Sequence, residues 1–272
     1  MQTTLAQMIA LTCFGNALLR GKAIDPFFPG NSTCQFCESI KFIAVNTTAA
    51  GEARTVTVAE TPDEWFAYLR RHSVEGFRLQ QKGRNNPQFP DRLSAGFVGG
   101  GKQWKIEVLR GDAASDFWLD RWVVGDRNAP DRRIWKVAYL LCETGPTAPL
   151  AMRSLNEIVG ELRLTLERIR VFSERENCGG FTKCFADAIR ALDDPDADIG
   201  YHKDLFPPGL LKPEAVSLLK AAQSAWVFGG MGSWNDMGFG GNVQVEYEKL
   251  SDMLFEGLNE AVEAAASSSM AA

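Results

Sequence analysis

The sequence is short of the residues that catalytic centres use most often. Only two histidines occur, His72 and His202, and neither lies beside a GxSxG or another known nucleophile motif. No apolar run reaches the length of about 18 residues that a membrane-spanning helix needs. The apolar stretch at residues 5–19 lacks the preceding basic residues of a signal peptide, so we interpret it as folded chain. These absences favour a cytoplasmic protein that is not an enzyme and has no membrane contact.

Six cysteines in 272 residues are too few, and too irregularly spaced, for a disulfide framework. Their scarcity is typical of a reducing compartment. Cys34 and Cys37 form a CxxC, the spacing of half a zinc site or of a dithiol redox pair. No second CxxC and no HxxxH is present, so a zinc site would need irregular ligands. We therefore expect ordinary thiols, no metal and no cofactor, with metal binding through these two residues as the alternative.

The charge is distributed unevenly along the chain. Residues 1–145 carry 18 basic and 15 acidic side chains, whereas residues 146–272 carry 11 and 19. An acidic C-terminal half argues against nucleic-acid binding and would suit a basic protein partner. The turn-rich segment at residues 144–149 marks the change from a strand-like to a helix-like sequence pattern. We predict an α+β domain at 1–145 and a helical domain at 146–272, or one continuous globular unit.

The first half has the pattern of an antiparallel sheet with one covering helix. Thr61, Pro62 and Glu64 form the capped start of that helix. Three consecutive glycines within residues 98–102 predict a hairpin between two strands. Strands are expected where β-branched and aromatic residues alternate with polar ones, at residues 39–45, 55–59, 76–81, 95–98, 103–109, 116–124 and 134–142.

The second half has apolar residues at helical spacing. Helices are predicted at residues 149–176, 181–192 and 214–228, and a last one follows residues 240–242. The fold class is therefore α+β, an N-terminal antiparallel sheet with a covering helix followed by a helical half of about four helices.

One segment between the last two predicted helices is unusual: FGGMGSWND, residues 228–236. Its three glycines permit positive φ angles and the close approach of another surface. Ser233 and Asp236 have the spacing of a helix start, and Gly229 or Gly230 occupies the place of a helix C-cap. We interpret the segment as a helix–turn–helix corner. A phosphate loop is the weaker reading, because no lysine or arginine lies between Lys220 and Lys249.

Residues 150–265 resemble a group of small bacterial proteins of unknown function that share an FGGMGSxND signature. The resemblance rests on residues 228–236, and the chain differs from that group in its N-terminal half of about 145 residues. It implies a bacterial source and a recurring structural corner. It implies no reaction, cofactor or catalytic residue.

Two functions remain open from the sequence. The first is an interaction protein of the immunity or accessory type, whose acidic last helix, at residues 246–263, would meet a basic partner such as a nuclease toxin. The second is an enzyme or small-molecule binder with a crevice between the halves, lined in part by one of the tryptophan-rich strands. The candidate site residues are Gly229, Gly230, Gly232, Ser233, Trp234, Asn235, Asp236 and His202, the last with Asp204 beside it.

Overall fold

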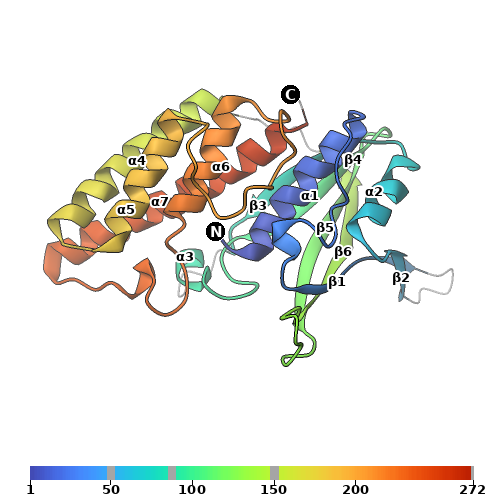
Figure 1. Ribbon diagram of the computed structural model, residues 1–272, viewed down its shortest axis with the longest axis horizontal. Helices are drawn as coiled ribbons and strands as arrows, with labels where there is room; N and C mark the ends of the chain where they lie inside the picture. The colour runs from blue at the N-terminus through green and yellow to red at the C-terminus, as the bar shows by residue number, and fades with distance from the viewer. Residues whose placement is uncertain (48–52, 85–89, 148–152, 271–272) are drawn as a thin grey trace.

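The computed structural model describes residues 1–47, 53–84, 90–147 and 153–270. Figure 1 shows the sheet with its covering helices at the right of the view and a bundle of helices at the left. This arrangement agrees with the predicted α+β class and helical C-terminal half. Within the described ranges, no helix combines the length and the hydropathy that crossing a membrane requires.

Six strands form one sheet in the order β2-β1-β6-β5-β4-β3. The sheet is mixed and not purely antiparallel, because β1 and β6 pair in parallel while the other neighbours are antiparallel. Alternation of apolar residues identifies a strand but carries no information about its direction, so the sequence could not reveal this pair. The strands are β1 (Cys37–Thr47), β2 (Ala53–Ala59), β3 (Val74–Lys82), β4 (Gln103–Arg110), β5 (Ala114–Val124) and β6 (Trp135–Pro146).

One face of the sheet is covered by two helices, α1 (Thr3–Leu19) and α2 (Pro62–Arg70). The capped start of α2 is confirmed, since Thr61 accepts a hydrogen bond from the Glu64 amide. The ring of Phe42 on β1 stacks on Trp65 of α2 at 4.2 Å and on Tyr139 of β6 at 5.1 Å. Aromatic stacking therefore joins the helical layer to the sheet.

Helix α1 is the element that the sequence did not reveal. All its residues from 5 to 17 are buried, because the helix lies between β3 and the last helix, α7 (Gly241–Ser268). A helix buried on all sides has no polar stripe, so it lacks the periodicity by which an amphipathic helix is recognised.

The helical half consists of α4 (Leu155–Arg175), α5 (Gly180–Asp193), α6 (Pro213–Ala225) and α7. Helix α7 packs on α4 and α6 and then continues to the sheet, where Ser267 exchanges hydrogen bonds with the backbone of Leu79. Buried apolar residues of both halves form one cluster. The division into domains at 1–145 and 146–272 remains a prediction.

Two local predictions are wrong. Residues 95–98 form no strand, and no hairpin joins them to β4; a short helix, α3 (Asp91–Ser94), is followed instead by a glycine-rich loop, residues 95–102. Helix α6 ends at Ala225 and not at Phe228, so α6 and α7 are joined by a long connection at residues 226–240. Both segments contribute to the candidate site.

Candidate functional site

Trp234 anchors the FGGMGSWND segment in the helical half. Its side chain is completely buried and meets the rings of Phe181 and Phe185 edge to face, each with a centroid distance of 5.3 Å. The indole N–H donates to Ser251 Oγ at 2.8 Å, and the hydroxyl of Tyr247 donates to the Trp234 carbonyl. The segment is therefore held against α5 and α7 by both packing and hydrogen bonds.

The side chains of Ser233 and Asp236 form hydrogen bonds within the segment. Ser233 Oγ donates to the Gly229 carbonyl at 3.1 Å and accepts from the Asn235 amide, and the Asp236 carboxylate accepts from the amide of Gly232. Residues Trp234–Asp236 form only the 3-10 turn η2, and α7 begins at Gly241. The predicted helix start at Ser233 is thus wrong, because Asp236 closes a turn backwards onto Gly232 and does not cap Ser233.

The same segment holds the loop at residues 95–102. Asn235 and Arg92 exchange hydrogen bonds, with Arg92 Nη1 donating to Asn235 Oδ1 and Asn235 Nδ2 to the Arg92 carbonyl. Gly96 lies directly on Gly229 and Gly230, and a Cβ atom at Gly96 would be 2.2 Å from the Gly229 carbonyl carbon. Such an approach of two backbones is possible only with glycine. The FGGMGSWND segment therefore positions the loop that follows α3.

This loop forms the rim of a hollow at the N-terminal end of α1, which we call the α1 hollow. Its volume is about 280 Å³, and it is lined by Thr4 and Met8 of α1, Trp104 of β4, and Asp120 and Trp122 of β5. A second hollow, of about 250 Å³, adjoins it and extends to Phe36, Phe97 and Trp135. Of the crevice expected from the sequence, the tryptophan-rich strands contribute to these hollows, whereas Ser233, Trp234, Asn235, Asp236 and His202 do not line them.

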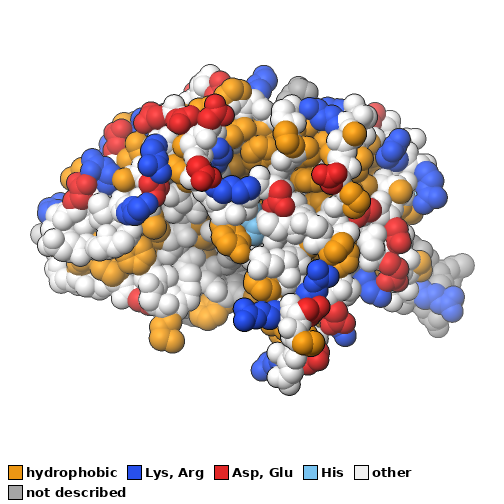
Figure 2. Space-filling model, viewed as in Figure 1, with side chains coloured by type: hydrophobic (Ala, Val, Ile, Leu, Met, Phe, Trp, Pro, Cys, Tyr) orange, Lys and Arg blue, Asp and Glu red, His pale blue; other side chains and the backbone are white. Residues whose placement is uncertain are grey.

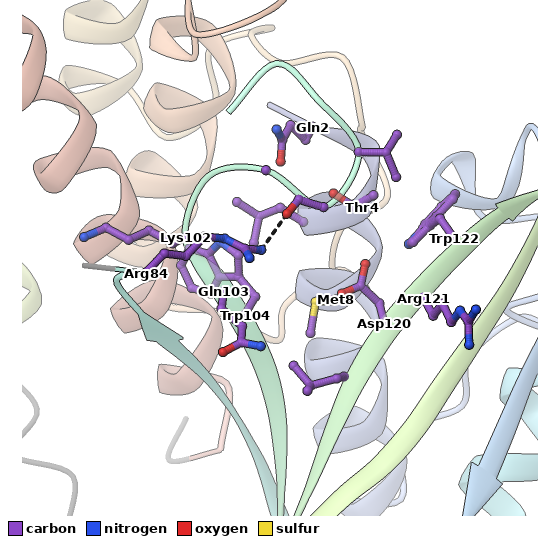
Figure 3. Close-up of a pocket in the computed structure, with 15 residues that line it drawn as sticks. Gln2, Thr4, Met8, Arg84, Lys102, Gln103, Trp104, Asp120, Arg121 and Trp122 are labelled. Carbon is purple, nitrogen blue, oxygen red and sulfur yellow. Dashed lines mark hydrogen bonds between the residues drawn. The ribbon is translucent and has the colours of Figure 1, made fainter. Parts of the chain in front are cut away.

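Asp120 is the group in the α1 hollow with the clearest chemical character. Figure 3 shows its carboxyl directed from β5 toward α1 and into the hollow. Burial raises the pKa of Asp120, while the nearby Trp122 indole and the more distant Arg84 guanidinium oppose the shift. The indole N–H of Trp122 has no hydrogen bond of acceptable geometry. A carboxyl with a perturbed pKa in a concave site is a typical functional group.

The basic side chains around the hollow are occupied elsewhere. Arg84 donates to the carbonyls of Gly99 and Gly101, and Lys102 forms a 2.8 Å ion pair with Glu256 of α7. Figure 3 shows Arg121 pointing away from the hollow. Among the described residues, Asp120 consequently has no ion-pair partner.

His202 lies in a different place. Its Nδ1 is 2.7 Å from Ser32 Oγ, and its backbone amide donates to Gln223 of α6. Ser32 gives its single hydroxyl proton to the Asp204 carboxylate, so His202 Nδ1 must be the donor to Ser32 Oγ. His202 therefore cannot act as a base toward Ser32, although the three residue types are those of a hydrolytic triad.

This histidine has a structural role instead. Burial lowers the pKa of His202, an effect that the Asp204 carboxylate opposes. Through Ser32 it ties the short 3-10 helix η1 (Ser32–Cys34) to the second half of the chain. In the described part of the chain, no hydrogen bond or ring contact joins His202 to residues 228–236. The structure thus does not bring the predicted site residues together.

Cys34 and Cys37 are both buried beneath the N-terminal part of α1. The Gln7 amide nitrogen is 4.0 Å and 3.6 Å from their sulfur atoms, and Tyr139 donates to Gln7 Oε1. Burial raises the pKa of Cys37 to about 11 and that of Cys34 further. Over the residues that the structure describes, no group of three or more histidine, cysteine or carboxylate side chains could hold a metal ion.

The sequence does contain a signal for Asp120. Trp118, Asp120 and Trp122 alternate along a strand, and residues two apart on a strand share a face. Trp118 is buried against the covering helices, so its face points to the core and Asp120 is an acidic residue on an inward face. An inward carboxylate between two tryptophans is the feature that sequence reasoning missed.

Comparisons of the chain with models of protein families, with curated proteins and with solved structures find no match.

Proposed function

We propose that the protein binds a small organic molecule in the α1 hollow, with a hydrogen-bond donor of the ligand facing the Asp120 carboxyl. The observation that carries this proposal is Asp120 itself, a partly buried carboxyl that lines a cavity without an ion-pair partner among the described residues. Burying a charge without a partner of opposite charge costs free energy. A ligand that carries a cationic donor would supply the charge partner that the described residues do not provide.

The rest of the lining is typical of a small-molecule site. Most pockets of this kind are apolar and contain a few fixed polar groups that orient the ligand. Here Met8, Trp104 and Trp122 supply apolar walls, and Thr4 adds a hydroxyl near the carboxyl. The rim is held by the FGGMGSWND segment, which gives that segment a supporting role.

Binding is favoured over covalent catalysis. Cys37 lines the second hollow, but with its pKa raised to about 11 the thiol stays protonated at neutral pH. A protonated thiol is a poor nucleophile. The nucleophile–base pair suggested by Ser32 and His202 has the wrong hydrogen-bond direction, as described above.

A basic protein partner for α7 has less support than the sequence indicated. The carboxylates of this helix are largely matched within the molecule, and Figure 2 shows acidic and basic side chains interspersed over the helical bundle. The ion pairs are Arg175–Glu246, Arg92–Asp252, Lys102–Glu256 and Arg153–Glu260. The protein partner, the cytoplasmic location and the bacterial source remain predictions from the sequence.

The proposal is tested by ligand-observed NMR with a panel of small primary amines and alcohols. We expect binders in this panel, and Asp120→Asn should weaken the best of them at least about tenfold, or about 1.4 kcal/mol. Asp126→Asn changes an exposed aspartate in the loop after β5 and serves as the matched control. If no panel member binds, or if both variants bind as the wild type does, the α1 hollow is not the site.

The pH dependence of stability gives a ligand-free test of the same carboxyl. Because burial raises the folded-state pKa of Asp120, the folded protein holds its proton to a higher pH than the unfolded chain does. The contribution of Asp120 to stability therefore falls as the pH rises from about pH 4 upward. Asp120→Asn should unfold at a higher temperature than the wild type at about pH 7, with the difference vanishing near pH 4. Equal stability at neutral pH would show that the carboxylate is already compensated.

A further inference from the structure

The α1 hollow and the second hollow adjoin each other, and we treat them as one elongated site. They share Gln2, Thr4, Val98 and Trp122, so the boundary between them is made of residues that face both spaces. At this boundary the side-chain amide nitrogen of Gln2 is buried without a hydrogen-bond acceptor. A molecule too large for one hollow would extend past Gln2 and occupy both hollows.

The two ends of this elongated site differ in chemistry. The α1 hollow presents the Asp120 carboxyl, whereas the second hollow presents the aromatic rings of Phe36, Phe97 and Trp135. Phe36 and Phe97 are exposed to 39% and 63%, so their rings are accessible to a ligand in the second hollow. Trp122 and Trp135 meet edge to face at 6.0 Å between these ends. One end thus suits a polar donor and the other suits a flat apolar group.

We infer that the ligand is an arylalkylamine: a primary amine, paired with Asp120, joined by a short aliphatic linker to an aromatic group that lies among Phe36, Phe97 and Trp135. This inference rests on the proposed function and adds the class of ligand to it. An ammonium group both donates hydrogen bonds to the carboxylate and neutralises its charge. An alcohol can donate a hydrogen bond but carries no charge. The basic side chains nearest the site do not take this place, since Arg84 is bound to backbone carbonyls and Lys102 to Glu256.

Three probe compounds distinguish the contribution of the amine from that of the aromatic group. Tryptamine carries both the amine and the aromatic group, indole-3-ethanol replaces the amine with a hydroxyl, and n-butylamine lacks the aromatic group. Isothermal titration calorimetry on the full chain near neutral pH should give tryptamine at least about tenfold tighter binding than either of the others. Asp120→Asn should abolish the preference for tryptamine over indole-3-ethanol.

The aromatic end is tested with variants at exposed positions, which we expect to fold normally. Phe36→Ala and Phe97→Ala should each weaken tryptamine about threefold to tenfold and leave n-butylamine unchanged. Leu164→Ala removes an apolar side chain of similar exposure on α4 and is the control. Circular dichroism of each variant checks that the fold is retained.

The possible failures are distinguishable. If indole-3-ethanol binds as tightly as tryptamine, the inferred need for an amine is wrong. If n-butylamine binds as tightly as tryptamine, the inferred need for an aromatic group is wrong. In both cases binding that depends on Asp120 would leave the proposed function intact. If the amines and alcohols of the wider panel show no binding that Asp120→Asn weakens, the proposed function fails together with this inference.

Discussion

Replacing Trp234 with alanine is expected to lower the free energy of unfolding by about 3–5 kcal/mol. The indole is completely buried among Phe181, Phe185 and Phe172, so its removal leaves a cavity in the helical half. The change also leaves Ser251 Oγ without the donor that it has at 2.8 Å. Denaturant unfolding followed by circular dichroism measures the loss.

Met231 supplies the control for this prediction. It lies in the same segment but its side chain is fully exposed, with a relative exposure of 101%. Met231→Ala should therefore change the free energy of unfolding by no more than about 0.5 kcal/mol. If Trp234→Ala were as mild as this control, the FGGMGSWND segment would not be the packed corner that its contacts indicate.

The second large effect is expected at Glu107, which has no solvent exposure. Its carboxylate accepts from Arg78 Nε and Nη2 at 2.8 and 2.7 Å, from Gln80 at 2.6 Å and from Ser115 at 2.7 Å. Glu107→Ala should cost about 3–5 kcal/mol, because it removes the buried carboxylate that binds Arg78, Gln80 and Ser115 together. The measurement is again denaturant unfolding near neutral pH.

Glu143 is the matched control on the same face of the sheet. It pairs with Lys105 at 3.3 Å, but its side chain is 59% exposed. An exposed pair contributes little, so Glu143→Ala should cost less than about 1 kcal/mol. A similar cost for the two variants would mean that the Arg78–Glu107 pair is solvated in the folded protein.

Prediction from the sequence succeeded where the pattern is local. The capped start of α2, the boundaries of α5 and the start of α7 all follow from side chains within a few residues of each other. Prediction failed at residues 95–98, where small and apolar residues resemble a strand. There the backbone is held by Gly229 and Gly230, more than 100 positions further along the chain. Sequence patterns over a few neighbouring residues cannot predict a contact between such distant positions.

In the candidate site, too, local features could be predicted from the sequence and contacts between distant residues could not. The glycines of the FGGMGSWND segment were recognised as permitting close approach, but the partner, Gly96, could not be named from the sequence. His202 and Asp204 are two positions apart in the sequence, while Ser32, which hydrogen-bonds to both, comes from the other half of the chain. Asp120 was overlooked because an acidic residue on a strand is usually at the surface.

The sequence by itself determined the α+β class and the approximate positions of most strands and of the C-terminal helices, because these depend on composition and on short-range periodicity. Only the tertiary structure decided the parallel pairing of β1 with β6, the burial of α1 and the α1 hollow. Each of these depends on which distant segments come into contact. Such contacts are selected by the packing of the whole core, which no local stretch of residues encodes.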